Sequence, residues 1–442
     1  MNGPLLALCL VLLLLQLTLP ARWAFIPILL AACHTPYTSD FGGFTVARLV
    51  IVVGLLRAAG SGLIRFDSQS SLDRRMMVFA AVALLSAVGH NALISNPYIF
   101  RIGLVLNVLG TYFYARAYLA SDEALERLSK GLAIALVPFA VLMVMEKQTG
   151  INPYAKLGAQ NLTSLVRDGK IRAQGPFGTP ILAGTVGACA VPLFIPLWKT
   201  RRRLAATGLG TCLVITYSSA SSGPISTVLL GMGAIALWRV RSHSRQIQIA
   251  TLCILVVLHF IKERPIWYLM ALMDFVGGST GWHRAYLIDV GVKHMGEWWL
   301  WGTDQTGHWM PYSLPTAVPG LFQADLTNYY LHLGVIGGLP LLFCLLAVQW
   351  SAFAQIGRKI REFGMAGTRE EFAVWCVGAA LFAHSVTFLS ISYFDQMYVF
   401  FWMIVGCLPA LLNTPADAGA DVEPEWDTAP NRGGRGSQPV PW

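Results

Sequence analysis

The residues of this sequence that can do chemistry are a few arginines that stand beside long apolar stretches. Arg172 belongs to the stretch Arg-Ala-Gln-Gly-Pro-Phe-Gly-Thr-Pro at 172–180, and Arg284 belongs to Trp-His-Arg-Ala-Tyr at 282–286. A guanidinium presents a planar fork of N–H donors that matches phosphate and carboxylate oxygens. The two arginines therefore predict a site for an anionic group, such as a lipid-linked phosphate.

Two further arginines, Arg48 and Arg101, lie near the expected outer ends of apolar runs. They are second candidates for the same anionic group, and the alternative is that their side chains extend to the membrane interface. For Arg172 and Arg284 the alternative is that a long loop tolerates charge without using it.

A proton acceptor is expected just before the apolar run at 326–352. Asp325 stands at the entrance to this run, beside Asn328 as a supporting residue, where an ionisable group is costly unless it is used. Its alternative role is to cap the helix that follows by accepting backbone N–H groups. His308 is the second candidate, and its alternative is a solvated surface histidine.

Composition indicates which elements must position these residues. Of the 442 residues, 55% are hydrophobic and 12% are charged, and the mean hydropathy is +0.56. A soluble globular domain has about 25% charged residues, so we expect a polytopic membrane protein. The net charge of +9 arises from basic residues at the ends of apolar runs, which is typical of topology signals, and nucleic-acid binding is not expected.

Apolar runs long enough to cross roughly 30 Å of hydrocarbon predict an all-α transmembrane bundle. The runs lie at 4–19, 44–59, 75–94, 98–119, 128–146, 181–198, 204–219, 222–238, 246–261, 326–352, 372–391 and 395–412. A short run at 23–33 leaves the count at twelve or thirteen spans, and the side of the N-terminus open.

Basic residues in short connections set the orientation, because such connections stay cytoplasmic. These connections lie at 199–203, 239–245 and 358–361. The membrane domain is expected at 1–412, with the segments 148–180 and 262–325 outside the membrane. The second is a large periplasmic loop between the spans at 246–261 and 326–352.

The periplasmic loop and the C-terminal tail differ in pattern. In the loop, apolar residues recur at helical spacing, which predicts an amphipathic helix on the membrane surface; they are Ile288, Val292, Met295 and Trp299. The tail at 413–442 is rich in Pro, Gly and Asp without a periodic apolar pattern, so we expect it to be disordered and cytoplasmic.

No motif indicates a cofactor, a metal or a nucleotide. The eight cysteines fall within or at the ends of apolar runs, and no phosphate-binding glycine loop and no His-Glu-x-x-His motif is present. We therefore expect neither a cofactor nor a metal. Among the remaining histidines, His283 and His294 are weaker candidates for the base than His308.

Three stretches resemble one family of membrane enzymes. They are residues 172–192; the turn Tyr-Ser-Ser-Ala-Ser-Ser-Gly at 217–223; and Arg284 followed by Trp301-Gly302, Asp-Leu-Thr-Asn-Tyr-Tyr at 325–330 and Gly334–Gly338. Their order is similar to that of the O-antigen ligase and polymerase superfamily, which assembles bacterial surface polysaccharides. The turn lacks the family's arginine. Thr327-Asn328 stands where ligases usually have a His-Asn pair, which moves the chain toward polymerase-like members.

The resemblance implies a membrane glycosyltransferase of the bacterial inner membrane. It would transfer a glycan from undecaprenyl diphosphate to an acceptor glycan or lipid at the periplasmic face, among membrane lipids. Arg172 and Arg284 would neutralise the departing diphosphate, while Asp325 or His308 would accept the proton of the acceptor hydroxyl. The alternative is a secondary transporter or flippase of an anionic solute or lipid-linked sugar, for which related halves or charges near mid-membrane are expected.

Overall fold

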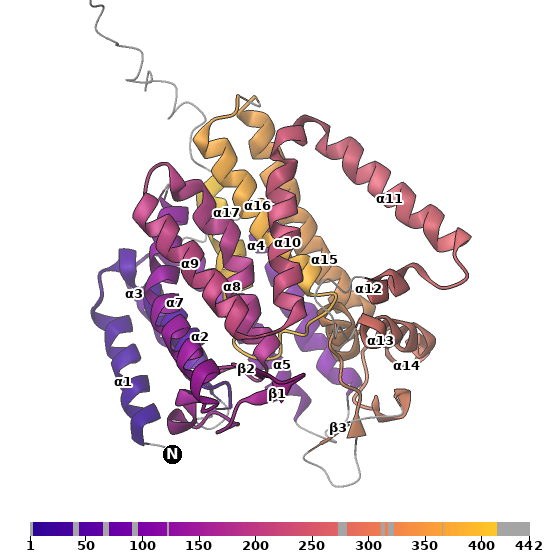
Figure 1. The fold of residues 1–442 in the computed structure, drawn as a ribbon, viewed down its shortest axis with the longest axis horizontal. Coiled ribbons are helices and arrows are strands. Elements are labelled where there is room, and N and C mark those ends of the chain that lie inside the picture. The colour runs from indigo at the N-terminus through magenta and orange to yellow at the C-terminus, as the bar shows by residue number, and fades with distance from the viewer. Residues whose placement is uncertain are drawn as a thin grey trace, which may run out of the picture.

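The computed structural model describes residues 3–38, 44–64, 70–90, 96–121, 123–272, 281–310, 314–316, 322–364 and 366–412. Within these ranges the chain is predominantly helical, and its sheets are two short antiparallel pairs of strands (Figure 1). The helical class expected from the sequence is therefore confirmed. The predicted tail at 413–442 lies outside the described residues.

Most helices coincide with the apolar runs of the sequence, and the helices of the segment 262–325 lie between two runs. In chain order they are α1 (Gly3–Thr18), α2 (Ile26–His34), α3 (Val46–Gly60), α4 (Ser71–Leu85), α5 (Pro97–Val105), α6 (Thr111–Tyr118), α7 (Ala124–Thr149), α8 (Pro180–Phe194), α9 (Arg202–Ser218), α10 (Ser222–Ala236), α11 (Ser244–Ile261), α12 (Leu269–Leu272), α13 (Gly281–Lys293), α14 (Met295–Trp298), α15 (Tyr329–Glu362), α16 (Arg369–Thr387) and α17 (Tyr398–Leu412). The strands are β1 (Leu165–Arg167), β2 (Lys170–Arg172), β3 (Leu314–Pro315) and β4 (Phe322–Gln323).

Among the described residues, five helical stretches are long and apolar enough to cross a membrane. They are Pro97–Tyr118, Ala124–Thr149, Pro180–Trp198, Ser222–Ile261 and Tyr329–Glu362. Shorter apolar helices occur at Gly3–Thr18, Ala21–His34 and Tyr398–Leu412. Some helices end before the apolar run that predicted them. In the run at 75–94, for example, α4 ends at Leu85 and a 3-10 turn follows at Ser86–Gly89. The chain thus has the helices of a membrane protein, and the count of twelve or thirteen spans stays a prediction.

Helix α17 lies inside the bundle and is apolar on all sides. Its Trp402 is 1% exposed and contacts the ring of Phe79 on α4, with ring centroids 6.2 Å apart. Phe401 is equally buried, and its ring lies edge-on to that of Trp402 at 4.8 Å. A helix that is hydrophobic all round belongs in an interior. On the peripheral helix α1, by contrast, Leu10 and Leu14 are more than half exposed, as a lipid-facing surface would be.

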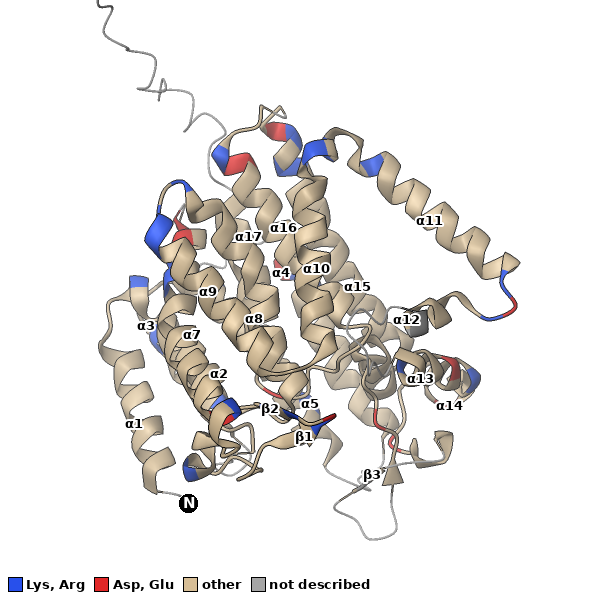
Figure 2. Cartoon of the chain, in the orientation of Figure 1, with Lys and Arg blue, Asp and Glu red and all other residues tan. Residues whose placement is uncertain are grey.

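Charged residues gather toward the two ends of the bundle (Figure 2). One end, called here the basic end, holds the connections at 199–203, 239–245 and 358–361. Ion pairs join neighbouring helices there, such as Arg201 with Glu126 at 3.0 Å and Arg241 with Glu371 at 2.6 Å. The β1–β2 hairpin lies at the opposite end, called here the hairpin end (Figure 1).

Helix α11 stands apart from the other helices (Figure 1). The chain bends between α10 and α11, where Val240 leaves helical geometry with φ −116° and ψ 21°. No residue of α11 is buried, and apolar side chains such as Ile254, Val257 and Phe260 are exposed. Large exposed apolar surfaces mark contact with a membrane or another protein, and α11 presents such a surface along its length.

Helix α15 is interrupted by a break at Gly338, a few turns after it begins. Gly338 has φ 73° and ψ −178°, a conformation that glycine adopts far more readily than other residues. At the break, Leu339 N donates to the carbonyl of Trp299 at 2.7 Å, and Thr303 N donates to the carbonyl of Val335 at 2.8 Å. Main-chain hydrogen bonds therefore fasten the segment that follows α14 to α15.

The segment of 262–325 in which an amphipathic helix is expected forms two helices, α13 and α14, which are separated at His294. Leu287 and Val290 on α13 form its buried face and pack in one cluster with Trp298. Two members of the predicted apolar stripe, Val292 and Trp299, are exposed instead. Met295 packs against the same cluster as Leu287 and Val290, so the predicted stripe is divided between buried and exposed positions, and the interfacial location stays a prediction.

Candidate functional site

Arg172 ends the β1–β2 hairpin. The turn of the hairpin is Asp168-Gly169, and both residues have positive φ, 51° and 71°, which suits a two-residue turn between antiparallel strands. After the hairpin, Ala173 N donates to the carbonyl of Ser218 at 3.1 Å. This bond ties the exit of the hairpin to the last residue of α9.

The Arg172 side chain points to the turn that joins α9 and α10. Its Nη2 donates to Ser221 Oγ at 2.7 Å, whereas its Nε is buried without a hydrogen-bond partner among the described residues. Burial lowers the pKa of Arg172, the nearby Arg167 lowers it further, and Asp168 opposes both. An anionic oxygen would satisfy the free N–H and relieve the burial of the cation.

Serine hydroxyls within the α9–α10 turn hold its shape. Ser219 Oγ donates to the carbonyl of Thr216 at 2.8 Å, and Ser221 Oγ donates to the carbonyl of Ser219 at 2.9 Å. Ala220 has φ 44°, which is uncommon for a residue with a side chain. Ser221 precedes the first turn of α10 but does not cap it with its side chain. The start of this 15-residue helix therefore offers backbone N–H donors and a positive dipole end beside Arg172.

Arg284 reaches the same turn from α13. Its Nη2 lies 3.7 Å from the point that a β-carbon on Gly223 would occupy, and Gly223 is in the first turn of α10. None of the described residues accepts a hydrogen bond from the Arg284 guanidinium or forms an ion pair with it. Burial lowers its pKa. The structure thus brings Arg172 and Arg284 to one turn, although they come from separate segments of the chain.

Sequence reasoning missed a third cation, Lys147 at the end of α7. Its Nζ donates to the carbonyl of Ile171 at 3.3 Å and lies 4.8 Å from the centroid of the Tyr217 ring. Tyr217 lies in the last turn of α9 and is 72% exposed. Its position directly after the apolar run at 128–146 is also that of an ordinary topology signal, so the sequence does not distinguish it as a site residue. The hairpin, the turn and α13 together form the cluster that we name the arginine site.

Asp325 and Asn328 have different roles from each other. Asn328 Oδ1 accepts Leu331 N at 2.9 Å and caps α15, and its Nδ2 donates to the carbonyl of Leu389 at 2.9 Å. The alternative role considered for Asp325, capping this helix, is therefore wrong. Asp325 is exposed, but partial burial of its carboxyl raises its pKa above the ordinary value, and the charge of His283 opposes this shift. Asp325 thus lies within electrostatic reach of the residue that precedes Arg284.

His308 belongs to a different cluster. It lies in a 3-10 turn at Gly307–Trp309, and its Nε2 is 3.0 Å from Glu297 Oε2. Glu297 is on α14, and the part of α13 that separates α14 from Arg284 is roughly 14 Å long. The structure therefore does not bring His308 together with Arg284.

Arg48 lies in another pocket of the hairpin end. Its Nε donates to Asn107 Oδ1 at 2.9 Å, and it lines a polar cavity of about 300 Å³ with Tyr37 and Asp395. Asp395 Oδ2 accepts Gly178 N at 3.2 Å, so the stretch 172–180 borders both this cavity and the arginine site. Burial raises the pKa of Asp395 to about 6, and the N–H groups of Met397 and Gly178 oppose this shift.

Arg101 is 3% exposed and is held within the protein. Its Nε donates to Ser86 Oγ at 3.2 Å, and its Nη2 donates to the carbonyl of Ile336, next to the break in α15. These bonds use the guanidinium to stabilise the break. The geometry therefore assigns Arg101 a structural contact and leaves it apart from the arginine site.

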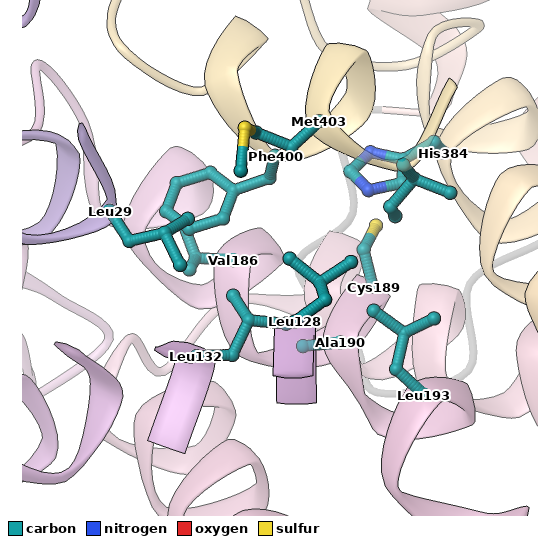
Figure 3. A pocket seen from close by; sticks show the side chains of 11 residues that line it. Leu29, Leu128, Leu132, Val186, Cys189, Ala190, Leu193, His384, Phe400 and Met403 are labelled. Atoms are coloured by element: carbon teal, nitrogen blue, oxygen red, sulfur yellow. The ribbon is translucent and has the colours of Figure 1, made fainter. Parts of the chain in front are cut away.

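A second enclosed space lies in the middle of the bundle but is too small for a substrate (Figure 3). His384 and Cys189 face leucines such as Leu128 and Leu193 across a gap of about 10 Å³. Such a volume holds at most one water molecule. His384 Nδ1 bonds the hydroxyl of Tyr393 at 2.8 Å, which satisfies this polar side chain in its apolar surroundings.

Comparison of the chain with known protein families finds no match, and comparison with curated proteins finds none either.

Proposed function

We propose that the protein is a membrane glycosyltransferase of the O-antigen ligase or polymerase type. The observation that carries this proposal is the arginine site, where Arg172 and Arg284 meet the uncapped start of α10. Two guanidinium groups and a helix N-terminus form a strong electrostatic environment for a diphosphate. The donor would be an undecaprenyl-diphosphate-linked oligosaccharide, and the acceptor another glycan or a lipid.

The chemistry assigns a role to each charged group. The acceptor hydroxyl attacks the anomeric carbon of the donor sugar, the bond from that carbon to the diphosphate oxygen breaks, and undecaprenyl diphosphate leaves. Arg172 and Arg284 stabilise the charge that develops on the departing diphosphate. Asp325 accepts the proton of the acceptor hydroxyl. No metal or cofactor is needed for this step.

The proposed topology has thirteen membrane segments, with α2 as the second and with α5 and α6 counted as one. Consecutive segments would run in alternating directions between the basic end and the hairpin end, as α8, α9 and α10 do in Figure 1. The basic end is then cytoplasmic by the charge rule, and the arginine site faces the periplasm of a bacterial inner membrane. The N-terminus lies on the periplasmic side, and α17 ends at the cytoplasmic side.

Gly223→Ala tests the proposal because it fills the arginine site without disturbing the fold. The new methyl group would lie 3.5 Å from Ile181 and 3.7 Å from Arg284 Nη2, which are ordinary contact distances. We expect inorganic pyrophosphate to bind the purified protein about tenfold more weakly in this variant, with an unchanged melting temperature. Titration calorimetry in detergent measures the affinity.

The matched control for this experiment is Gly233→Ala, which places the same methyl group on the same helix in open space. It should bind pyrophosphate as the wild type does. Equal pyrophosphate affinity in Gly223→Ala and the wild type would reject the arginine site as the diphosphate site.

Asp325→Asn should reduce glycan transfer by roughly 10²-fold, because it removes the proton acceptor. Since the pKa of Asp325 is raised above its ordinary value, wild-type activity should fall as the pH decreases through that raised pKa and the carboxylate becomes protonated. The measurement is product length on a gel after incubation with undecaprenyl-diphosphate oligosaccharide. Asp289→Asn, which affects only an ion pair with Lys293 on α13, should retain activity. An Asp325→Asn variant as active as this control would exclude Asp325 as the base.

The alternative function, secondary transport or flipping, lacks a supporting observation. Transporters of this kind bind substrate near the middle of the bilayer, whereas the arginine site lies at one end of the bundle. Counterflow of a labelled anionic solute into vesicles, without product formation, would favour this alternative over glycan transfer.

A further inference from the structure

Three side chains that can bind a metal converge at the far end of α13. His294 follows α13 directly, Glu297 is on α14, and His308 is on the 3-10 turn that follows. Their ligand atoms all lie within 4.8 Å of one another. The shortest separations are 2.7 Å from His294 Nδ1 to Glu297 Oε1 and 3.0 Å from His308 Nε2 to Glu297 Oε2.

The donor set fits zinc. Two imidazole nitrogens and one carboxylate are a common set of protein ligands for Zn²⁺, with bonds of roughly 2.0–2.2 Å and a fourth position left for water. Tetrahedral ligands at such bond lengths lie roughly 3.3–3.6 Å apart. Both observed separations, 2.7 and 3.0 Å, are shorter than this, so the two histidines must each move away from Glu297 by roughly 0.3–0.9 Å to admit the ion. Metal bonds would replace the hydrogen bonds that Glu297 now makes with both imidazoles.

The ligands are oriented by Trp309, which is 4% exposed and fixed in the hydrophobic cluster of α13 and α15. Its indole Nε1 donates to Glu297 Oε2 at 2.9 Å. Its ring stacks on that of His294, with centroids 5.4 Å apart and planes 14° from parallel. Hydrogen bonds and ring stacking around metal ligands hold the ligands in the orientation that binding requires. Glu297 and His308 are exposed, which leaves the ion a path from solvent.

We propose that His294, Glu297 and His308 bind a Zn²⁺ ion, with water as the fourth ligand. The ion would link α14 to the turn at Gly307–Trp309 and hold the segment between them against α15. The sequence predicts no metal, because these three ligands do not follow a familiar spacing. The site is separate from the arginine site, and the proposal does not depend on glycan transfer.

The test uses the full-length protein in detergent, stripped with a chelator and then titrated with ZnCl₂. We expect micromolar or tighter binding and a melting temperature that rises by several degrees in excess Zn²⁺, because the ion binds the folded state. His294→Ala and His308→Ala should each weaken this binding at least tenfold and remove the thermal shift. MgCl₂ should give no shift, since Mg²⁺ prefers oxygen ligands.

The control is His243→Ala, because this histidine is exposed at the basic end and bonds only Ser242 among the described residues. It should bind Zn²⁺ as the wild type does. His308→Gln keeps the size and polarity of the side chain and guards against a folding defect. Zn²⁺ affinity that is unchanged in His294→Ala and His308→Gln, or a thermal shift that disappears only when the exposed Cys253 is changed to Ser, would overturn the proposal.

Discussion

Arg172→Ala and Arg284→Ala are each expected to lower glycan transfer by roughly 10²–10³-fold, the cost of removing one preorganised donor from a developing anion. The double variant should show no detectable product. Arg172 contributes an N–H that lacks a partner, and Arg284 a guanidinium that no described residue pairs. Both cations are therefore available to the departing diphosphate.

The experiment compares product formation by purified variants in proteoliposomes supplied with undecaprenyl-diphosphate oligosaccharide. Arg172→Lys should recover only part of the activity, because an ammonium retains the charge but lacks the planar fork. Arg264→Ala is the matched control, since this exposed arginine precedes α13 and, among the residues that the structure describes, contacts the ring of Tyr268 alone. Full activity in Arg172→Ala and Arg284→Ala with normal expression would contradict the proposed role of the arginine site.

Gly338→Ala is expected to have the largest effect on folding. A β-carbon at this position would overlap the backbone carbonyl of Leu300, and neither group belongs to a flexible side chain. The conformation of Gly338 alone costs other residues about 1–3 kcal/mol. We expect the variant to lose several degrees of melting temperature or to fail to accumulate as a monodisperse protein.

Fluorescence-detected size exclusion after heating steps measures this effect in detergent extracts. Gly233→Ala again provides the control, because its methyl group meets no atom within 4 Å and alanine favours a helix. If Gly338→Ala had the same melting temperature as Gly233→Ala, the break in α15 would accommodate a β-carbon without loss of stability, and the prediction would be wrong.

The helices and the pair of arginines were predictable from the sequence, because both depend on local signals. Apolar runs specify helices through length and composition, and Arg172 and Arg284 were notable as cations outside the expected spans. Their approach to one turn depends on how α9, α10 and α13 pack, which a single sequence does not encode in any local pattern. The Ser-rich turn at 217–223 was noted only through a family resemblance.

Other site residues were harder to predict because competing roles use the same residue types. Asn328 was taken as a support for Asp325. Its side-chain oxygen instead accepts Leu331 N and caps α15, while its amide nitrogen donates to the carbonyl of Leu389. His308 was considered a base, yet the chain folds back to place it against Glu297. Such pairings are set by tertiary contacts, and spacing along the chain does not reveal them.

The break in α15 has a consequence for how chains of this design can diverge. The junction at Gly338 uses the amides of Thr303 and Leu339 and the carbonyls of Trp299 and Val335, and every residue type except proline supplies both groups. Mutations can therefore exchange the side chains of these four residues while the main-chain hydrogen bonds between them are kept. Gly338 would thus keep the segment after α14 attached to α15 while the side chains on the surface of that segment change.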